Sequence, residues 1–157
     1  MDEGMLTVSS GKPIWRMSEV ESLLAAYGKA VFEKDLEAFL SLFDEDVRIF
    51  DMWGRWSYDG LAAWRDMVME WFSSLGVLRD RLSFEAVEYL SSGDLATVTA
   101  IARFAAVSPE GDELRFLHNR ITLVLRRQSG GWKIVHQHTS APVDGETLKA
   151  MLQRGAE

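Results

Sequence analysis

Two of the three histidines in this chain, His136 and His138, lie close together near its end, where imidazole groups could bind a ligand or move protons. Their segment, 131–140, includes a Gly-Gly pair at its start and predicts a β-strand. Because side chains alternate along a strand, one face carries Trp132, Ile134, His136, His138 and Ser140. That face changes from apolar to polar along the strand, which is typical of the wall of a half-open pocket.

A histidine pair at this spacing could supply two ligands to a metal ion, but a tetrahedral zinc site needs at least three protein ligands. The chain has no cysteine, and His118 is its only other histidine. We therefore expect neither a metal site nor another cofactor. We expect that one histidine closes the core through a hydrogen bond and that the pair contributes to a ligand pocket. An imidazole there could bind a polar ligand group or act as a general acid or base.

The preceding strand, predicted over 113–127, carries two further candidates for ligand binding, His118 and Arg120. A three-residue loop at 128–130 would place Arg120 opposite His138, whereas a two-residue Gly-Gly turn would present the other face of the strand. The longer loop is favoured because it gathers an apolar row on the opposite face: Ile121, Leu123 and Leu125. An inward Arg120 would suit a carboxylate or an enolate, and an outward one would be a surface arginine.

Asp51 is the carboxylate in this sequence that best fits the role of a general base. It ends a short strand predicted at 47–51, and its apolar neighbours could exclude water and raise its pKa: Phe50, Met52 and Trp53. The alternative is a turn aspartate bonded to backbone amides before Gly54. Tyr27, on the apolar face of the first predicted helix, is either a core tyrosine or a hydrogen-bond donor in the pocket. Trp53 is also expected to line this pocket.

The order of the predicted elements indicates an α+β fold. A capping box begins a first helix at Ser18, Asp35 precedes a short second helix, and a third runs from about 60 to 75. A short hairpin is expected between the second and third helices. Four long strands then follow: 79–90, 94–107, 113–127 and 131–140. Their short connections make neighbouring strands antiparallel, so three N-terminal helices cover one face of a curved sheet.

Length and composition are those of one globular domain: 157 residues, 47% hydrophobic and 26% charged. We expect a leader at 1–17, a single domain at 18–143, and a tail or short helix at 144–157. The net charge of −7 disfavours nucleic acids and anionic membranes as partners, because both bind cationic faces. The chain shows no signal-peptide pattern and no apolar run of about 20 residues, so we expect a cytoplasmic protein.

The element order and several motifs resemble the nuclear transport factor 2-like superfamily, the cone fold of the SnoaL-like proteins, over about residues 18–143. The stretch 132–142 is similar to the end of the association domain of calcium/calmodulin-dependent protein kinase II. Phe50-Asp51, followed by Asp59-Gly60-Leu61, also resembles that domain. The resemblance implies a cone-shaped, strongly curved and mostly antiparallel sheet, with the strand 131–140 at its last edge.

A second resemblance is to ketosteroid isomerase, which has a catalytic tyrosine on its first helix and an aspartate base on its first strand. Tyr27 and Asp51 stand at matching positions with a similar separation. The resemblance implies that Asp51 is a base and Tyr27 an oxyanion donor. That enzyme also uses a protonated aspartic acid on a later strand. The corresponding region here, around Thr122, holds no acid, so steroid isomerisation itself is not implied.

These observations support three hypotheses. The first is a binding protein for an apolar small molecule that carries a carboxylate or carbonyl. The second is a proton-transfer enzyme, a cofactor-independent isomerase, cyclase or dehydratase with Asp51 as base. The third is an oligomeric association module. A row of apolar side chains would meet water on the outer face of the sheet: Ile121, Leu123, Leu125 and Val135. We therefore expect a homodimer through that face.

Overall fold

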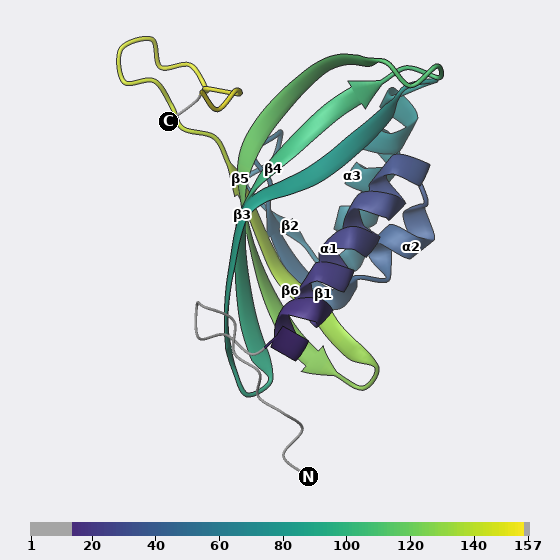
Figure 1. Cartoon of the computed structure of the whole chain (residues 1–157), viewed down its shortest axis with the longest axis vertical. Coiled ribbons are helices and arrows are strands. Elements are labelled where there is room, and N and C mark those ends of the chain that lie inside the picture. The colour runs from purple at the N-terminus through teal and green to yellow at the C-terminus, as the bar shows by residue number, and fades with distance from the viewer. Residues whose placement is uncertain (1–13, 156–157) are drawn as a thin grey trace.

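The chain folds into a strongly curved sheet with three helices packed on its concave face (Figure 1). The computed structural model describes residues 14–155. The elements are α1 (Ile14–Glu33), α2 (Leu36–Leu40), β1 (Phe43–Phe50), β2 (Tyr58–Asp59), α3 (Leu61–Ser74), β3 (Arg79–Ser92), β4 (Leu95–Val107), β5 (Glu113–Gln128) and β6 (Gly131–Ser140). This arrangement confirms the predicted α+β class and the curved sheet.

The six strands form one sheet in the order β2-β1-β6-β5-β4-β3. Strands β3 to β6 form the antiparallel meander that their short connections predict. β1 pairs in parallel with β6, so β6 lies inside the sheet and not at the edge that the resemblance implies. Phe50 at the end of β1 pairs with His138 near the end of β6, which brings Asp51 beside the last residues of β6.

The helices cover the concave face through a continuous apolar core. α3 places Trp64, Val68 and Phe72 at intervals of four residues, so all three side chains point toward the sheet and are buried. α1 contributes a similar stripe: Val20, Leu23, Leu24, Tyr27 and Val31. Asp35 caps α2 as predicted, because its carboxylate accepts a hydrogen bond from the Ala38 amide at 3.0 Å. No helix within residues 14–155 combines the length and the apolar character needed to cross a membrane.

The N-terminal boundary of the first helix differs from the prediction. α1 begins at Ile14, before the predicted cap at Ser18, so the end of the expected leader is already helical. The rest of that leader, residues 1–13, lies outside the described part of the chain. The helical pattern therefore extends one turn further back than the capping-box motif indicates.

The C-terminal segment forms no helix between Asp144 and residue 155. Oδ1 of Asp144 accepts hydrogen bonds from the amides of Glu146 and Thr147, which closes a turn instead. The chain then returns to β5, where the carbonyl of Leu152 accepts a hydrogen bond from the His118 amide at 2.7 Å. This segment occupies the side of β5 that β6 leaves free beyond its end.

The β5–β6 hairpin has a two-residue turn, because Gln128 pairs with Gly131, so the predicted three-residue loop is wrong. The apolar row of β5 faces the helices, and its members are almost fully buried in the core: Ile121, Leu123 and Leu125. The expectation that this row lies on the outer face is therefore wrong. A homodimer was expected because this row would be exposed to water, so that reason for expecting a homodimer no longer holds.

A β-bulge in β6 decides which side chains of this strand face the core. Leu125 and Val124 are consecutive in β5, but they pair with Ile134 and His136. Val135 is the extra residue between those two partners, and it shifts the alternation of the strand by one. Every side chain beyond the bulge therefore points to the face opposite the one that simple alternation from Ile134 predicts.

Candidate functional site

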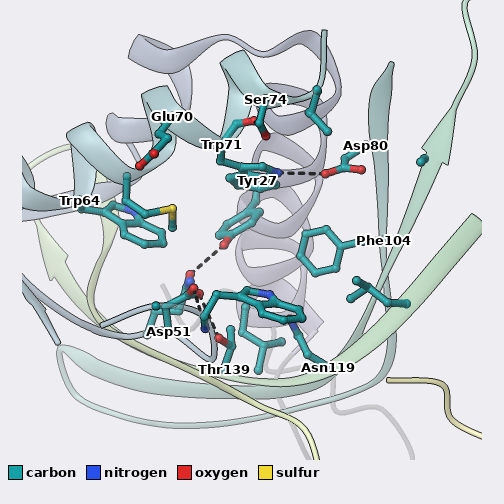
Figure 2. Close-up of a pocket in the computed structure, with 18 of the residues that line it drawn as sticks. Tyr27, Asp51, Trp64, Glu70, Trp71, Ser74, Asp80, Phe104, Asn119 and Thr139 are labelled. Carbon is teal, nitrogen blue, oxygen red and sulfur yellow. Dashed lines mark hydrogen bonds between the residues drawn. The ribbon is translucent and has the colours of Figure 1, made fainter. Parts of the chain in front are cut away.

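A cavity of about 490 Å³ lies between the concave face of the sheet and helices α1 and α3. Its aromatic lining comprises Tyr27, Trp53, Tyr58, Trp64, Trp71, Phe104 and Phe116. The polar or charged lining residues form two groups, and Figure 2 shows Asp51 and Thr139 of the first on the side opposite to Ser74 and Asp80 of the second. We call the first the Asp51 cluster: Tyr27, Asp51, Asn119, Gln137 and Thr139. We call the second the Asp80 cluster: Glu70, Trp71, Ser74, Asp80 and Arg115.

The carboxylate of Asp51 is held at the cavity wall by neutral donors. Oδ1 accepts a hydrogen bond from the Thr139 hydroxyl at 3.1 Å, and Oδ2 accepts one from the Trp53 amide at 3.2 Å. The Thr139 oxygen in turn accepts a hydrogen bond from the Met52 amide at 2.9 Å. Burial raises the pKa of Asp51, and the two hydrogen bonds oppose this shift. Asp51 is thus both a turn residue and a partly desolvated carboxylate, so the two readings of the sequence are compatible.

Tyr27 closes the same end of the cavity from helix α1. Its hydroxyl donates a hydrogen bond to Oε1 of Gln137 at 2.8 Å, and its side chain is buried (Figure 2). Burial raises the pKa of Tyr27 well above its usual value, and the nearby charge of Asp51 adds to this effect. The phenol therefore keeps its proton throughout the physiological pH range.

The structure adds three residues to the predicted site, namely Asn119, Gln137 and Thr139. Gln137 and Thr139 alternate with the two predicted histidines, and the bulge at Val135 turns them inward. No sequence pattern marks that bulge, because Val135 is as apolar as its neighbour. Asn119 could have been found, because it shares its strand face with the apolar row of β5 and is the polar residue at its end.

Four predicted site residues do not line the cavity: His118, Arg120, His136 and His138. The ring of His136 bonds through Nδ1 to the backbone oxygen of Arg48 at 2.7 Å, and His138 is exposed. Nε of Arg120 donates a hydrogen bond to Ser140 on the convex face. The expectation that these side chains face the pocket is wrong because the hairpin turn and the bulge reverse the faces of β5 and β6.

His118 is also absent from the cavity wall, although its neighbours Leu117 and Asn119 are part of it. Nδ1 of His118 accepts a hydrogen bond from the backbone amide of Arg154 at 3.0 Å. The residue therefore holds the returning C-terminal segment against β5. Within residues 14–155, no three histidine or carboxylate side chains are grouped closely enough to hold a metal ion.

The comparisons with known proteins agree on one fold. The SnoaL-like domain family matches residues 20–144. An NTF2-like protein of unknown function from Pseudomonas putida KT2440 is similar in structure, with 24% sequence identity and a TM-score of 0.79, over 91% of this chain and 98% of that one. A protein from Novosphingobium aromaticivorans, assigned as an aromatic ring hydroxylase, shares 23% identity at a TM-score of 0.69, over 82% and 90% of the two chains.

A third structure, from Xanthomonas campestris, is assigned as a calcium/calmodulin dependent protein kinase II association domain. It shares 16% identity at a TM-score of 0.67, over 79% of this chain and 86% of that one. Identities this low show a common fold and nothing about activity. No curated protein matches the chain. The family match covers most of the sequence, and the structure has the curved sheet that the resemblance implied. The chain therefore belongs to the SnoaL-like domain family and has an NTF2-like fold.

Proposed function

We propose that this protein binds a small, largely apolar molecule whose carbonyl group enters the Asp51 cluster. The observation that carries the proposal is the cavity itself: its aromatic wall ends in hydrogen-bonding groups that come from α1, β5, β6 and the turn after β1. A volume of about 490 Å³ suits a molecule of two or more fused rings. The apolar wall would supply affinity, and the polar groups at one end would fix the orientation of the ligand.

The arrangement supports a carbonyl more than a carboxylate at the Asp51 end. Arg120, the expected partner of a carboxylate, lies on the convex face, and Asp51 would repel an anion placed beside it. A neutral carbonyl meets no such repulsion. The amide of Asn119 could donate a hydrogen bond to it, and the neutral hydroxyl of Tyr27 could donate one in place of its hydrogen bond to Gln137. Among residues 14–155 the buried Oδ1 of Asn119 has no hydrogen-bond partner, so no donor holds that oxygen in place and a turn of the amide would present its NH₂ to the carbonyl.

Asp51 also favours a second candidate function, proton transfer on the bound ligand. A carboxylate whose pKa is raised by burial is a stronger base than one in water, and it lies at the cavity wall. Such a base would remove a proton from the carbon next to the carbonyl. The C–H bond breaks, the proton is held on Asp51, and the electron pair moves to the carbonyl oxygen as an enolate. Return of the proton to carbon completes the reaction, so the step needs no oxidant, reductant or cofactor.

Binding can be tested with 2-acetylnaphthalene, a neutral two-ring ketone, by isothermal titration calorimetry and thermal shift. We expect binding by the native protein and by Asp112→Asn, a control in the exposed β4–β5 turn. Gln137→Glu would place a second carboxylate beside the carbonyl, and we expect it to weaken binding about tenfold or more. The same affinity in Gln137→Glu would place the ketone elsewhere, and no binding by the native protein would end the proposal for ketones of this size.

Proton transfer is tested separately by NMR in D₂O, through exchange of the methyl protons of the bound ketone. If Asp51 is a base, the native protein accelerates this exchange, and Asp51→Asn abolishes the acceleration while it still binds the ketone. Binding without accelerated exchange would leave the binding function and remove the catalytic one for this ligand. Equal acceleration by both proteins would show that another group takes the proton.

A further inference from the structure

The Asp80 cluster is a second polar site in the same cavity, distant from the Asp51 cluster. In Figure 2 Trp71, Ser74 and Asp80 lie in the upper part of the view, Glu70 lies to their left, and Asp51 lies in the lower part. The rings of Tyr27 and Phe104 are drawn between Asp51 and Asp80, so the space between these two carboxylates is bounded by aromatic rings. A ligand that fills the cavity would therefore meet polar groups at both of its ends.

The register of the sheet explains the geometry of this second site. Asp80 on β3 pairs with Ala106 on β4, and Ala106 pairs with Arg115 on β5. The three residues thus form one row across the sheet, and all three line the cavity. Because the middle residue is an alanine, the row leaves open space between the acid and the arginine. No ion pair joins Arg115 to an acid within the described part of the chain, although its charge lowers the pKa of Asp80.

Asp80 has one hydrogen bond that orients it and one oxygen that remains available. The indole of Trp71 donates from Nε1 to Oδ2 of Asp80 at 3.0 Å. No donor of residues 14–155 bonds to Oδ1, which leaves that oxygen for a ligand. Asp80 is partly buried, and burial is the main influence on its pKa, which is raised. A partly buried acceptor oxygen that has no donor is energetically unfavourable. A ligand hydrogen bond to Oδ1 would therefore add more to the binding affinity than one to an oxygen that already has a donor.

The charges around Asp80 decide which ligand group fits. The Asp80 cluster holds two carboxylates, Glu70 and Asp80, and one guanidinium, Arg115. An incoming carboxylate would be repelled by Asp80 itself, even though Arg115 and Lys34 also act on that carboxyl. A hydroxyl or a protonated amine would donate to Oδ1 of Asp80, which accepts a hydrogen bond from no donor of residues 14–155. The balance favours a group that donates hydrogen bonds.

We propose that Asp80 accepts a hydrogen bond from a hydroxyl or a protonated amino group at the far end of the ligand. The ligand is then an elongated apolar molecule with a carbonyl at one end and a donor group at the other. This inference rests on the proposed binding function, and it assigns Asp80 as a residue that determines specificity. Trp71 acts through Asp80 as a positioning residue, because its indole fixes the orientation of the carboxylate.

The test uses four ketones that share the 2-acetylnaphthalene frame and differ only at ring position 6. The substituents are hydrogen, hydroxyl, aminomethyl and carboxylate. We expect the hydroxyl or the aminomethyl compound to bind about tenfold tighter than the parent ketone. The carboxylate should bind more weakly than the parent. Comparing the hydroxyl compound with the aminomethyl compound distinguishes a neutral donor from a cation.

Asp80→Asn is the informative variant, because it keeps the shape of the side chain and an oxygen for the Trp71 indole but turns an amide NH₂ toward the ligand. We expect it to lose the tenfold gain, so that it binds the hydroxyl and the aminomethyl compounds no more tightly than it binds the parent ketone. Trp71→Phe keeps an aromatic wall and removes only the indole donor, so it should reduce the gain in part. Asp112→Asn should retain the full gain.

The outcomes separate this inference from the binding function on which it rests. If the parent ketone binds but neither donor group improves its affinity, the cavity binds ketones and the role of Asp80 is wrong. The same holds if the gain survives in Asp80→Asn, or if the carboxylate is the tightest ligand. If none of the four compounds binds to the native protein, the proposed binding function fails as well.

Discussion

The hydrogen-bond donors around the Asp51 carboxylate carry no charge, and this affects how the stability of the folded protein depends on pH. Burial raises its pKa in the folded protein, so the folded state binds the proton more tightly than the unfolded state does. Above the ordinary pKa of about 3.9, ionisation of Asp51 costs more in the folded protein than in the unfolded chain. The contribution of Asp51 to stability is therefore largest at low pH and is lost as the pH rises through its folded pKa.

Asp51→Asn should remove this pH-dependent loss. An asparagine can accept the hydrogen bond of the Trp53 amide and donate one to the Thr139 oxygen, so the number of local hydrogen bonds is kept, although the Thr139 hydroxyl proton then has to turn away from residue 51. We expect the variant to be more stable than the native protein at pH 7. The difference should shrink as the pH falls toward the ordinary pKa of aspartate. Urea unfolding at a series of pH values measures it, and a native protein as stable as the variant at pH 7 would contradict the desolvation argument.

The two residues predicted as catalytic, Asp51 and Tyr27, could each be placed in the fold from a short stretch of sequence. Asp51 follows directly from the end of β1, and Tyr27 belongs to the apolar stripe of α1. Each could be placed from its own element. The hydrogen bond between Tyr27 and Gln137 could not, because it joins residues 110 positions apart and depends on the bulge in β6. Local patterns thus predict the candidate base, but not the partners that complete its site.

At the scale of the element, the extra residue Val135 in β6 explains why the site residues predicted on this strand differ from the observed ones. A strand face repeats every two residues, so a bulge of one residue exchanges the two faces for the rest of the strand. Ile134 and Val135 are both apolar and β-branched, so the sequence suits either of them for the core. The structure buries Ile134, and the bulge then turns Gln137 inward and His138 outward. The sequence therefore predicts the strand itself, but not which of its side chains face the core.

The β5–β6 hairpin is fastened to α1 by a single carboxylate. Oε2 of Glu19 accepts hydrogen bonds from Nη2 of Arg127 and Nε1 of Trp132, each at 2.6 Å. The guanidinium of Arg127 also lies over the indole of Trp132, 4.4 Å from the ring centroid. Both partners of the ion pair are partly exposed, so its contribution to stability is modest, about 1 kcal/mol.

We expect Glu19→Ala to lower the free energy of unfolding by about 1 kcal/mol, and to make local opening of α1 and of the β5–β6 hairpin more frequent. Hydrogen exchange should quicken in the amides of α1 near residue 19 and in the hairpin turn, but not in the middle of β4. Glu21→Ala is the matched control, because Glu21 is an exposed residue on the same helix. Equal exchange rates in the two variants would show that Glu19 does not fasten the hairpin.

At the scale of the molecule, the order of elements was enough to predict the fold. Short connections require the antiparallel meander, and apolar stripes require the helices to cover one face of it. The parallel contact between β1 and β6 was not predictable in the same way, because it joins strands that are distant in sequence. That contact places Asp51 beside Thr139, so the site depends on the part of the topology that local patterns do not determine.

Within residues 14–155 no helix covers the convex face of the sheet, since α1, α2 and α3 all lie on the concave side (Figure 1). Its centre is a row without acidic side chains, lysine or arginine, in which Thr99, Thr122, His138 and Phe50 pair in succession across four strands. The guanidinium of Arg48 lies over Phe50 at the β1 end of this row, 4.7 Å from the ring centroid. Val124 and His136 form the next pair, and both are half-buried. Interfaces between proteins are depleted of charge at their centre in the same way. We propose that two copies of this chain associate through this face, although not through the apolar row first expected there.

Val124→Glu tests this association, because it places a charge at the centre of the face without reaching the core. We expect the native protein to have twice the mass of one chain by light scattering at micromolar concentration, and the variant to be a monomer that unfolds as cooperatively as before. Ser83→Glu, an exposed position on the edge strand β3, is the control and should remain dimeric. A native monomer would remove the proposal. A dimer that survives Val124→Glu would place the interface elsewhere, because a buried, unpaired carboxylate is too costly for the centre of a stable contact.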